Sequence, residues 1–169
     1  CLTSLIKSTY PKLEILVLDD CSQFRRTPEI IREFAHAGVR FIKGDPPRDG
    51  WLAKNQAYAK LTREASSKLI LYCGVDIRLE PDSIMRLVQE LLGKEKRMLC
   101  VLPKRVGGRS AVQFAVVQAA RYGWELALPR RLFNRPAVLS SCWLIYKADI
   151  KAYGGFAAVS RSIAPEAYF

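Results

Sequence analysis

The chain lacks an apolar run long enough to span a bilayer, which takes about 18 or more apolar residues in succession. Its longest weakly polar stretch, Ser110 to Ala120, is interrupted by Gln113 and Gln118. The chain also opens without a Met, and without the basic and apolar segments of a secretory signal. We therefore expect no membrane span, and we expect the domain in the cytoplasm or at the cytoplasmic face of a membrane.

The sequence has no C-x-x-C pair, and its five cysteines are scattered and odd in number. This usage is typical of a reducing compartment. Cys73, Cys100 and Cys142 sit inside apolar runs and are predicted to be small core residues. Internal repeats and low-complexity segments are also missing, so a single ordinary globular unit is the simplest interpretation.

Acidic residues are scarce relative to basic ones, because 27 Lys and Arg face 16 Asp and Glu, for a formal net charge of +11. Such an excess favours an anionic partner, which could be nucleic acid, a membrane surface or a phosphorylated small molecule. The basic residues are spread along the chain, and no RNP-like, KH-like or zinc signature accompanies them. A nucleic-acid-binding module therefore stays only an alternative, and no nucleic acid partner is expected.

Half of the 169 residues are apolar and a quarter are charged, a composition suited to one globular domain. Strand and helix patterns alternate through residue 103. Near-continuous apolar runs predict strands at 13–20, 39–44, 68–73 and 97–103, and helical spacing predicts helices at 27–38, 51–65 and 80–94. Thr27 is the expected N-cap of the first helix, and Gly38 is its expected end.

This alternation predicts an α/β fold with a mostly parallel sheet and helices on both faces. The remainder of the chain is less regular. A basic glycine loop at 104–110, a helix at 111–128, a basic link at 129–137, a strand at 138–146 and a short helix at 147–156 are expected there. No change of composition marks a boundary, so we predict one domain in two lobes.

The ends of three successive predicted strands carry charged residues. Asp19 and Asp20 end the first strand, Lys43 ends the second, and Asp76 lies just past the third. In open α/β sheets, ligands bind outside the carboxyl ends of the strands. This convergence indicates a binding site at one rim of the sheet, although acids at strand ends are also common turn residues.

Four motifs in order resemble the membrane-associated inverting glycosyltransferases of family 2, which have the GT-A fold. They are "SLIKSTYPKLEILVLDDCS", "GWLAKNQA", "LILYCGVDIRLEPDSI" and "YGGF", and together they cover nearly the whole chain. The resemblance implies a nucleotide-sugar donor, a UDP-sugar in the first instance, and a hydroxyl acceptor that could be lipid-linked. It implies a nucleotide-binding part at about 1–103, an acceptor-side part at about 104–169, and a longer protein that extends past both ends of this chain.

The resemblance also implies roles for the strand-end acids. Asp20, supported by Asp19, would contact the nucleoside base, and Asp76 would hold the donor diphosphate through Mg²⁺ or Mn²⁺. The family's Asp-x-Asp falls on Gly74-Val75-Asp76, so the first acid is missing here. Because one acid is lost, a non-catalytic domain that still binds nucleotide sugars is an open alternative.

Two further residues take roles from the resemblance. Lys54 would meet a donor phosphate, although it could equally be a lysine on a solvated helix face. Glu166 would be the catalytic base that follows the double glycine, with Pro165 where the family has a second acid. An acid in the first turn of a helix is the ordinary alternative for Glu166.

The basic link and the end of the helix before it interleave arginines with large apolar residues. Such a segment could rest on an anionic membrane surface, or its apolar residues could pack inward while the arginines are solvated. The residues concerned are Arg121, Arg130, Arg131 and Arg135 with Trp124, Leu128, Leu132 and Phe133.

Overall fold

The computed structural model describes residues 1–22, 26–104, 112, 115, 116, 119, 120 and 141–169. In chain order the helices are α1 (Leu2–Ile6), α2 (Arg26–Glu33), α3 (Ala53–Glu64), α4 (Ser83–Gly93) and α7 (Lys147–Ala152). The strands are β1 (Ile15–Asp19), β2 (Val39–Lys43), β3 (Leu69–Cys73), β4 (Met98–Cys100) and β5 (Cys142–Tyr146). The predicted basic link at 129–137 lies outside the described residues, as does most of the predicted helix at 111–128.

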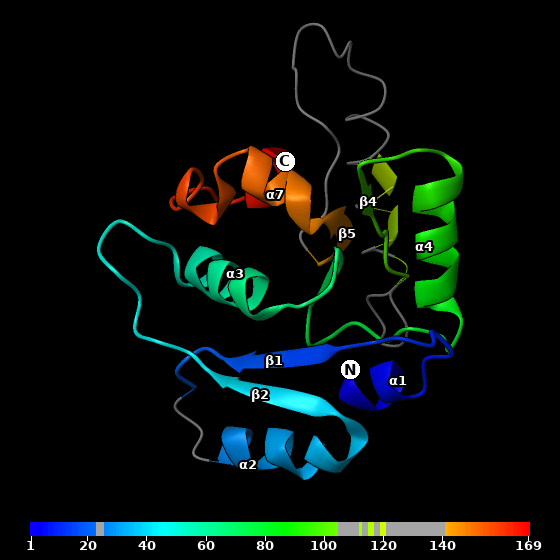
Figure 1. Ribbon diagram of the computed structural model, residues 1–169, viewed down its shortest axis with the longest axis horizontal. Helices are drawn as coiled ribbons and strands as arrows, with labels where there is room; N and C mark the ends of the chain where they lie inside the picture. The colour runs from blue at the N-terminus through cyan, green and yellow to red at the C-terminus, as the bar shows by residue number, and fades with distance from the viewer. Residues whose placement is uncertain (23–25, 105–111, 113–114, 117–118, 121–140) are drawn as a thin grey trace, which may run out of the picture.

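Strands β1 and β2 form a parallel pair joined by α2, with Ile15 opposite Val39 and Asp19 opposite Lys43. Figure 1 shows α2 on one side of this pair and α3 on the other, so helices cover both faces as predicted. Helix α2 begins at Arg26, which places Thr27 inside the first turn and not at the predicted N-cap. The α-helix ends at Glu33, earlier than predicted, and a 3-10 turn at Ala35–Ala37 follows it. Gly38 ends that turn, with a φ of 80° that suits glycine.

The second sheet has the order β3-β5-β4, and both of its pairings are antiparallel. The α/β class is confirmed, but hydrogen-bonded parallel pairing in the described part of the chain is confined to β1 and β2. Strands β3 and β4 run in the same direction without bonding to each other, because β5 from the C-terminal part lies between them. The alternation of strand and helix patterns along residues 1–103 could not predict that β5, from the C-terminal part of the chain, would pair between β3 and β4.

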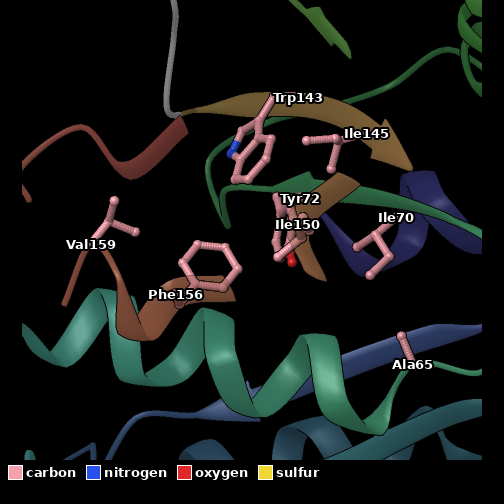
Figure 2. Close-up of a cluster of buried hydrophobic side chains, with 8 residues drawn as sticks. All are labelled: Ala65, Ile70, Tyr72, Trp143, Ile145, Ile150, Phe156 and Val159. Carbon is pink, nitrogen blue, oxygen red and sulfur yellow. The ribbon is translucent and has the colours of Figure 1, made fainter. Parts of the chain in front are cut away.

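Strand β5 has apolar side chains on both faces and separates two hydrophobic clusters. On one face, Trp143 stacks on Tyr72 with ring centroids 4.2 Å apart, and Phe156 packs beside them next to α3 (Figure 2). On the other face, Leu144 packs against the apolar side of α4, which includes Leu91. This two-sided burial explains the continuous apolar run "CWLIY".

The three cysteines predicted to be core residues are at least partly buried, and Cys142 is completely so. None of the five cysteines, all of which lie in the described part of the chain, forms a disulfide. Across the residues that the structure describes, no helix combines the length and apolarity that crossing a membrane requires.

Candidate functional site

The carboxyl end of β1 turns sharply at the acidic pair. The carbonyl oxygen of Asp19 accepts hydrogen bonds from the backbone N–H groups of Gly44 at 2.8 Å and Cys21 at 2.9 Å. The N–H of Ser22 donates to Oδ1 of Asp19 at 3.3 Å. Asp20 is exposed, whereas Asp19 is half-buried and part of its carboxylate is engaged in the turn. Asp20 is therefore the acid of this pair whose side chain is available to a ligand.

Glycine at position 44 is needed for the approach of β2 to this turn. A Cβ atom there would lie 2.4 Å from the carbonyl oxygen of Asp19, which is far inside van der Waals contact. The contact is with backbone, which cannot rotate away. Gly44 thus allows the ends of β1 and β2 to meet, as the rim hypothesis required.

Asp76 is exposed in the turn that follows β3, where the N–H of Ile77 donates to the carbonyl of Gly74 at 3.1 Å. The guanidinium of Arg78 donates to the carbonyls of Val75 at 2.9 Å and Ile77 at 3.0 Å. A Cβ atom at position 74 would lie 2.9 Å from Oδ1 of Asp76. The carboxylate of Asp76 thus occupies space that a side chain at position 74 would need.

Lys54 and Glu166, to which the sequence assigned separate roles, lie together. The Lys54 Nζ is 3.7 Å from Oε2 of Glu166, and it donates to the carbonyl of Ile163 at 3.4 Å. The Glu166 side chain is 2% exposed, whereas that of Lys54 is 37% exposed. Within the described part of the chain, Oε2 of Glu166 has no hydrogen-bond partner. Glu166 is therefore a buried carboxylate with an unused acceptor atom.

Tyr58 lies one turn further along α3, with Nζ of Lys54 5.6 Å from the centre of its ring. Burial raises the pKa of the Tyr58 phenol, and the nearby charge of Glu166 acts in the same direction. The Glu166 carboxylate thus lies near the ammonium group of Lys54 and the ring of Tyr58, and it is almost entirely shielded from solvent.

Asn55 is the functional candidate that the sequence interpretation missed. It is fully buried, and its Nδ2 lies within hydrogen-bond distance of the carbonyls of Val159 at 2.8 Å, Ser160 at 3.0 Å and Ser162 at 2.8 Å. The Leu52 N–H also donates to the Ser160 carbonyl at 2.9 Å. The start of α3 thus holds the loop that leads to Glu166. The available signal was an amide directly after Lys54 in the "GWLAKN" motif.

A hollow of about 500 Å³ lies along the loop that leads to Glu166, although Glu166 is not among its lining residues. Ala164 and Ala167, which flank Pro165 and Glu166 in the chain, are among its lining residues. Arg161 lines it as well, and its Nε donates to the carbonyl of Gly50 at 3.3 Å. The hollow is large enough to hold a small polar group.

The predicted site residues fall into three places: Asp19 and Asp20 after β1, Asp76 after β3, and Lys54 with Glu166 at the start of α3. Among the described residues, no hydrogen bond or ion pair joins one of these three places to another. In the described ranges, no cluster of three or more His, Cys, Asp or Glu side chains is placed to hold a metal ion. A ligand that contacts all three places would therefore have to extend from one to the next.

Comparison with known proteins gives two findings. The family model described as "Glycosyl transferase family 2" matches residues 1–154. Among solved structures, the chain is similar to the crystal structure of residues 1–349 of S. aureus TarS in complex with UDP, with a TM-score of 0.58 at 20% identity. That alignment covers 89% of this chain and 43% of the TarS chain. No curated protein matches the sequence.

The likeness to TarS, at this level of identity, supports the predicted GT-A-like α/β fold. The family match spans the acidic turn after β1, the "GWLAKN" motif and the turn after β3, and it ends at Gly154. Glu166 lies beyond the matched residues. Because the match covers nearly the whole chain, this protein belongs to glycosyl transferase family 2.

Proposed function

We propose that this domain moves a sugar from a nucleoside diphosphate sugar to a hydroxyl acceptor, with inversion at the anomeric carbon. The family match supports the transfer of a sugar. The TarS structure was determined with UDP, which favours a uridine donor here. The observation that carries the catalytic part is the buried Oε2 of Glu166, which lies 3.7 Å from Nζ of Lys54 and has no hydrogen-bond partner in the described residues.

At the donor end, Asp20 would read the nucleoside base from the turn after β1. Its exposed carboxylate can accept hydrogen bonds from the N–H groups of a base. Asp19 would support it by fixing the turn through the Ser22 N–H and the carbonyl that binds Gly44. This assignment gives the two acids different tasks.

Asp76 would bind the divalent cation that the family implies, Mg²⁺ or Mn²⁺. A single exposed carboxylate fits such an ion when the diphosphate and water supply the remaining oxygen ligands, an arrangement that Mg²⁺ commonly adopts. A bound cation would neutralise the charge on the leaving nucleoside diphosphate. Because Gly74 replaces the first acid, this motif would supply one carboxylate ligand and not two.

At the acceptor end, Glu166 would accept the proton of the acceptor hydroxyl while that oxygen attacks the anomeric carbon from the face opposite the leaving group. The acceptor hydroxyl would have to reach Oε2, which makes no hydrogen bond in the described residues although Nζ of Lys54 lies 3.7 Å from it. Lys54 would fix the carboxylate through its ammonium group, and the predicted direct contact of Lys54 with a phosphate becomes a secondary role.

A second candidate function is donor binding without transfer. Gly74 favours it, because the first acid of the family's Asp-x-Asp is absent. The low exposure of Glu166 also favours donor binding without transfer, because an acceptor can reach a buried carboxylate only where the site opens.

The deciding experiment measures UDP release from UDP-sugars by the full-length protein with and without acceptor, alongside thermal shifts with UDP- and GDP-sugars in the presence and absence of Mn²⁺. Transfer with Mn²⁺-dependent donor binding would support the enzyme. Donor binding without transfer would favour the second candidate. The absence of both donor binding and transfer would overturn both candidates.

The acceptor could be lipid-linked, and the domain could work at an anionic, cytoplasmic membrane face. The interleaved arginines and large apolar residues between 121 and 135 motivate this part of the proposal.

A further inference from the structure

Cys73 and Cys142 lie directly opposite each other at the ends of β3 and β5, in an antiparallel pairing. The next pair outward is hydrogen-bonded, because the Gly74 N–H donates to the Ser141 carbonyl at 2.8 Å. The Cys142 carbonyl instead accepts from the Val101 N–H, on the opposite edge of β5, at 2.8 Å. The two cysteines therefore form a pair without backbone hydrogen bonds to each other.

Such pairs bring their side chains closer than hydrogen-bonded pairs do, with Cα atoms about 4.5 Å apart in antiparallel sheets. Disulfides span Cα separations of about 4.4–6.8 Å. Opposed residues also project their side chains on the same face of a sheet, so the side chains of Cys73 and Cys142 lie next to each other. Cys142 is fully buried and Cys73 is partly exposed, so solvent can reach one of the pair.

The two thiols also interact. A hydrogen bond between them raises the pKa of Cys73 and lowers the pKa of Cys142. Both thiols are free in the structure.

We propose that Cys73 and Cys142 form an oxidative modification site, at which a peroxide joins the two sulfur atoms in a reversible cross-strand disulfide. Hydrogen peroxide first oxidises one of the two thiols to a sulfenic acid and releases one water molecule. The sulfur of the other cysteine then attacks the oxidised sulfur, forms the S–S bond and displaces the hydroxyl as a second water molecule. Overall, two thiols lose two electrons and two protons, and peroxide is reduced to two water molecules.

This bond would act on the turn that carries Asp76. Residue 73 ends β3, and the turn begins at Gly74, whose N–H already binds the Ser141 carbonyl. A disulfide would tie the base of the turn to β5 covalently, in addition to that hydrogen bond. The inference stands on strand register and does not depend on the proposed transfer reaction.

Peptide mapping of the full-length protein tests the site directly. Trypsin places Cys73 in Leu69–Arg78 and Cys142 in Leu132–Lys147, with one cysteine in each peptide. After peroxide and rapid alkylation under denaturing conditions, we expect these two peptides linked, at their summed mass less two hydrogen atoms. Dithiothreitol should separate them. Peptides that are both alkylated as free thiols after peroxide would overturn the proposal.

Variants supply the controls. Cys100 is the matched control, because it pairs in register with Trp143 and packs on the opposite face of the sheet. Cys100→Ser should leave the cross-link intact, and Cys73→Ser should abolish it. A cross-link from Cys142 to Cys100, or between two molecules, would also overturn the assignment. The wild-type map decides the matter even where a variant folds poorly.

A thermal unfolding comparison gives an independent readout. A disulfide restricts the unfolded chain, so the oxidised wild type should melt at a higher temperature than the reduced form, and Cys73→Ser should show no such shift. An equal shift in Cys73→Ser would show that peroxide acts elsewhere and would count against the proposal.

Discussion

The Lys54 ammonium nitrogen lies 3.7 Å from a carboxylate oxygen of Glu166, which joins the start of α3 to the C-terminal end of the chain. The same end of α3 contributes Asn55, whose amide reaches three carbonyls of the intervening loop. Two residues at the start of α3 therefore help to hold Glu166 in place. Glu166 and Asn55 can be tested separately, because one supplies the buried carboxylate and the other supports the loop that leads to it.

Glu166→Gln should leave donor binding within about twofold and reduce transfer at least about a hundredfold, the lower end of the contribution of a general base. The amide keeps the volume of the carboxylate but cannot take the proton of the acceptor. The measurement is initial-rate transfer by the full-length protein, together with UDP-sugar affinity. Transfer at the parental rate would place the base elsewhere.

Asp76→Asn should remove the Mn²⁺-dependent part of UDP-sugar binding and leave the fold intact, because Asp76 is exposed and an amide is a poor ligand for hard cations. Calorimetric titration with and without Mn²⁺ measures this. Glu80→Gln is the matched control, since it neutralises another exposed acid close by in the chain. Retention of the full Mn²⁺ effect in Asp76→Asn would contradict the assignment.

Asp20→Ala should weaken UDP and UDP-sugar by the same factor, because the lost contact is to the base and is remote from the sugar. Competition binding with both ligands checks the prediction. Asp49→Ala removes an exposed acid from the loop before α3 and should leave both affinities unchanged. Weakening of the UDP-sugar alone would move Asp20 away from the base.

Asn55→Ala should destabilise the fold by about 1–3 kcal/mol, because the carbonyls of Val159 and Ser162 lose a donor in a buried or part-buried setting. Gln56→Ala should cost less. Its amide also reaches two carbonyls, of Asp45 at 3.0 Å and Pro46 at 2.9 Å, but on an exposed loop. Urea unfolding of the two variants gives the comparison. Equal losses of unfolding free energy in the two variants would show that Asn55 stabilises the loop before Glu166 no more than Gln56 stabilises its own exposed loop.

Binding to liposomes should require anionic lipid and should fall as salt rises, since surface attraction is screened over about 10 Å at 0.1 M ionic strength. Co-sedimentation of the full-length protein with neutral and anionic vesicles measures it. Replacing Arg130 and Arg131 by Gln should reduce pelleting. Equal pelleting with both vesicle types would remove the membrane-surface hypothesis.

Local pattern accounted for much of the fold. The apolar run that ends at Asp19 and Asp20 became β1, and the helical spacing of Ile84, Val88 and Leu91 became the buried side of α4. These predictions succeeded because the periodicity of a strand or helix is written in neighbouring residues. The pairing of β5 between β3 and β4 was not predicted, because strand partners are chosen by packing across the whole chain.

The sequence by itself determined the alternation of strands and helices, the acids at the strand ends, and through its motifs the resemblance to family 2. Only the tertiary structure decided that Lys54 meets Glu166, that Asn55 holds the loop between them, and that Cys73 opposes Cys142. The physical reason is the range of the interactions. Hydrophobic periodicity and turn chemistry act over a few residues, whereas burial of a carboxylate and the register of two strands depend on segments that meet only when the chain has folded.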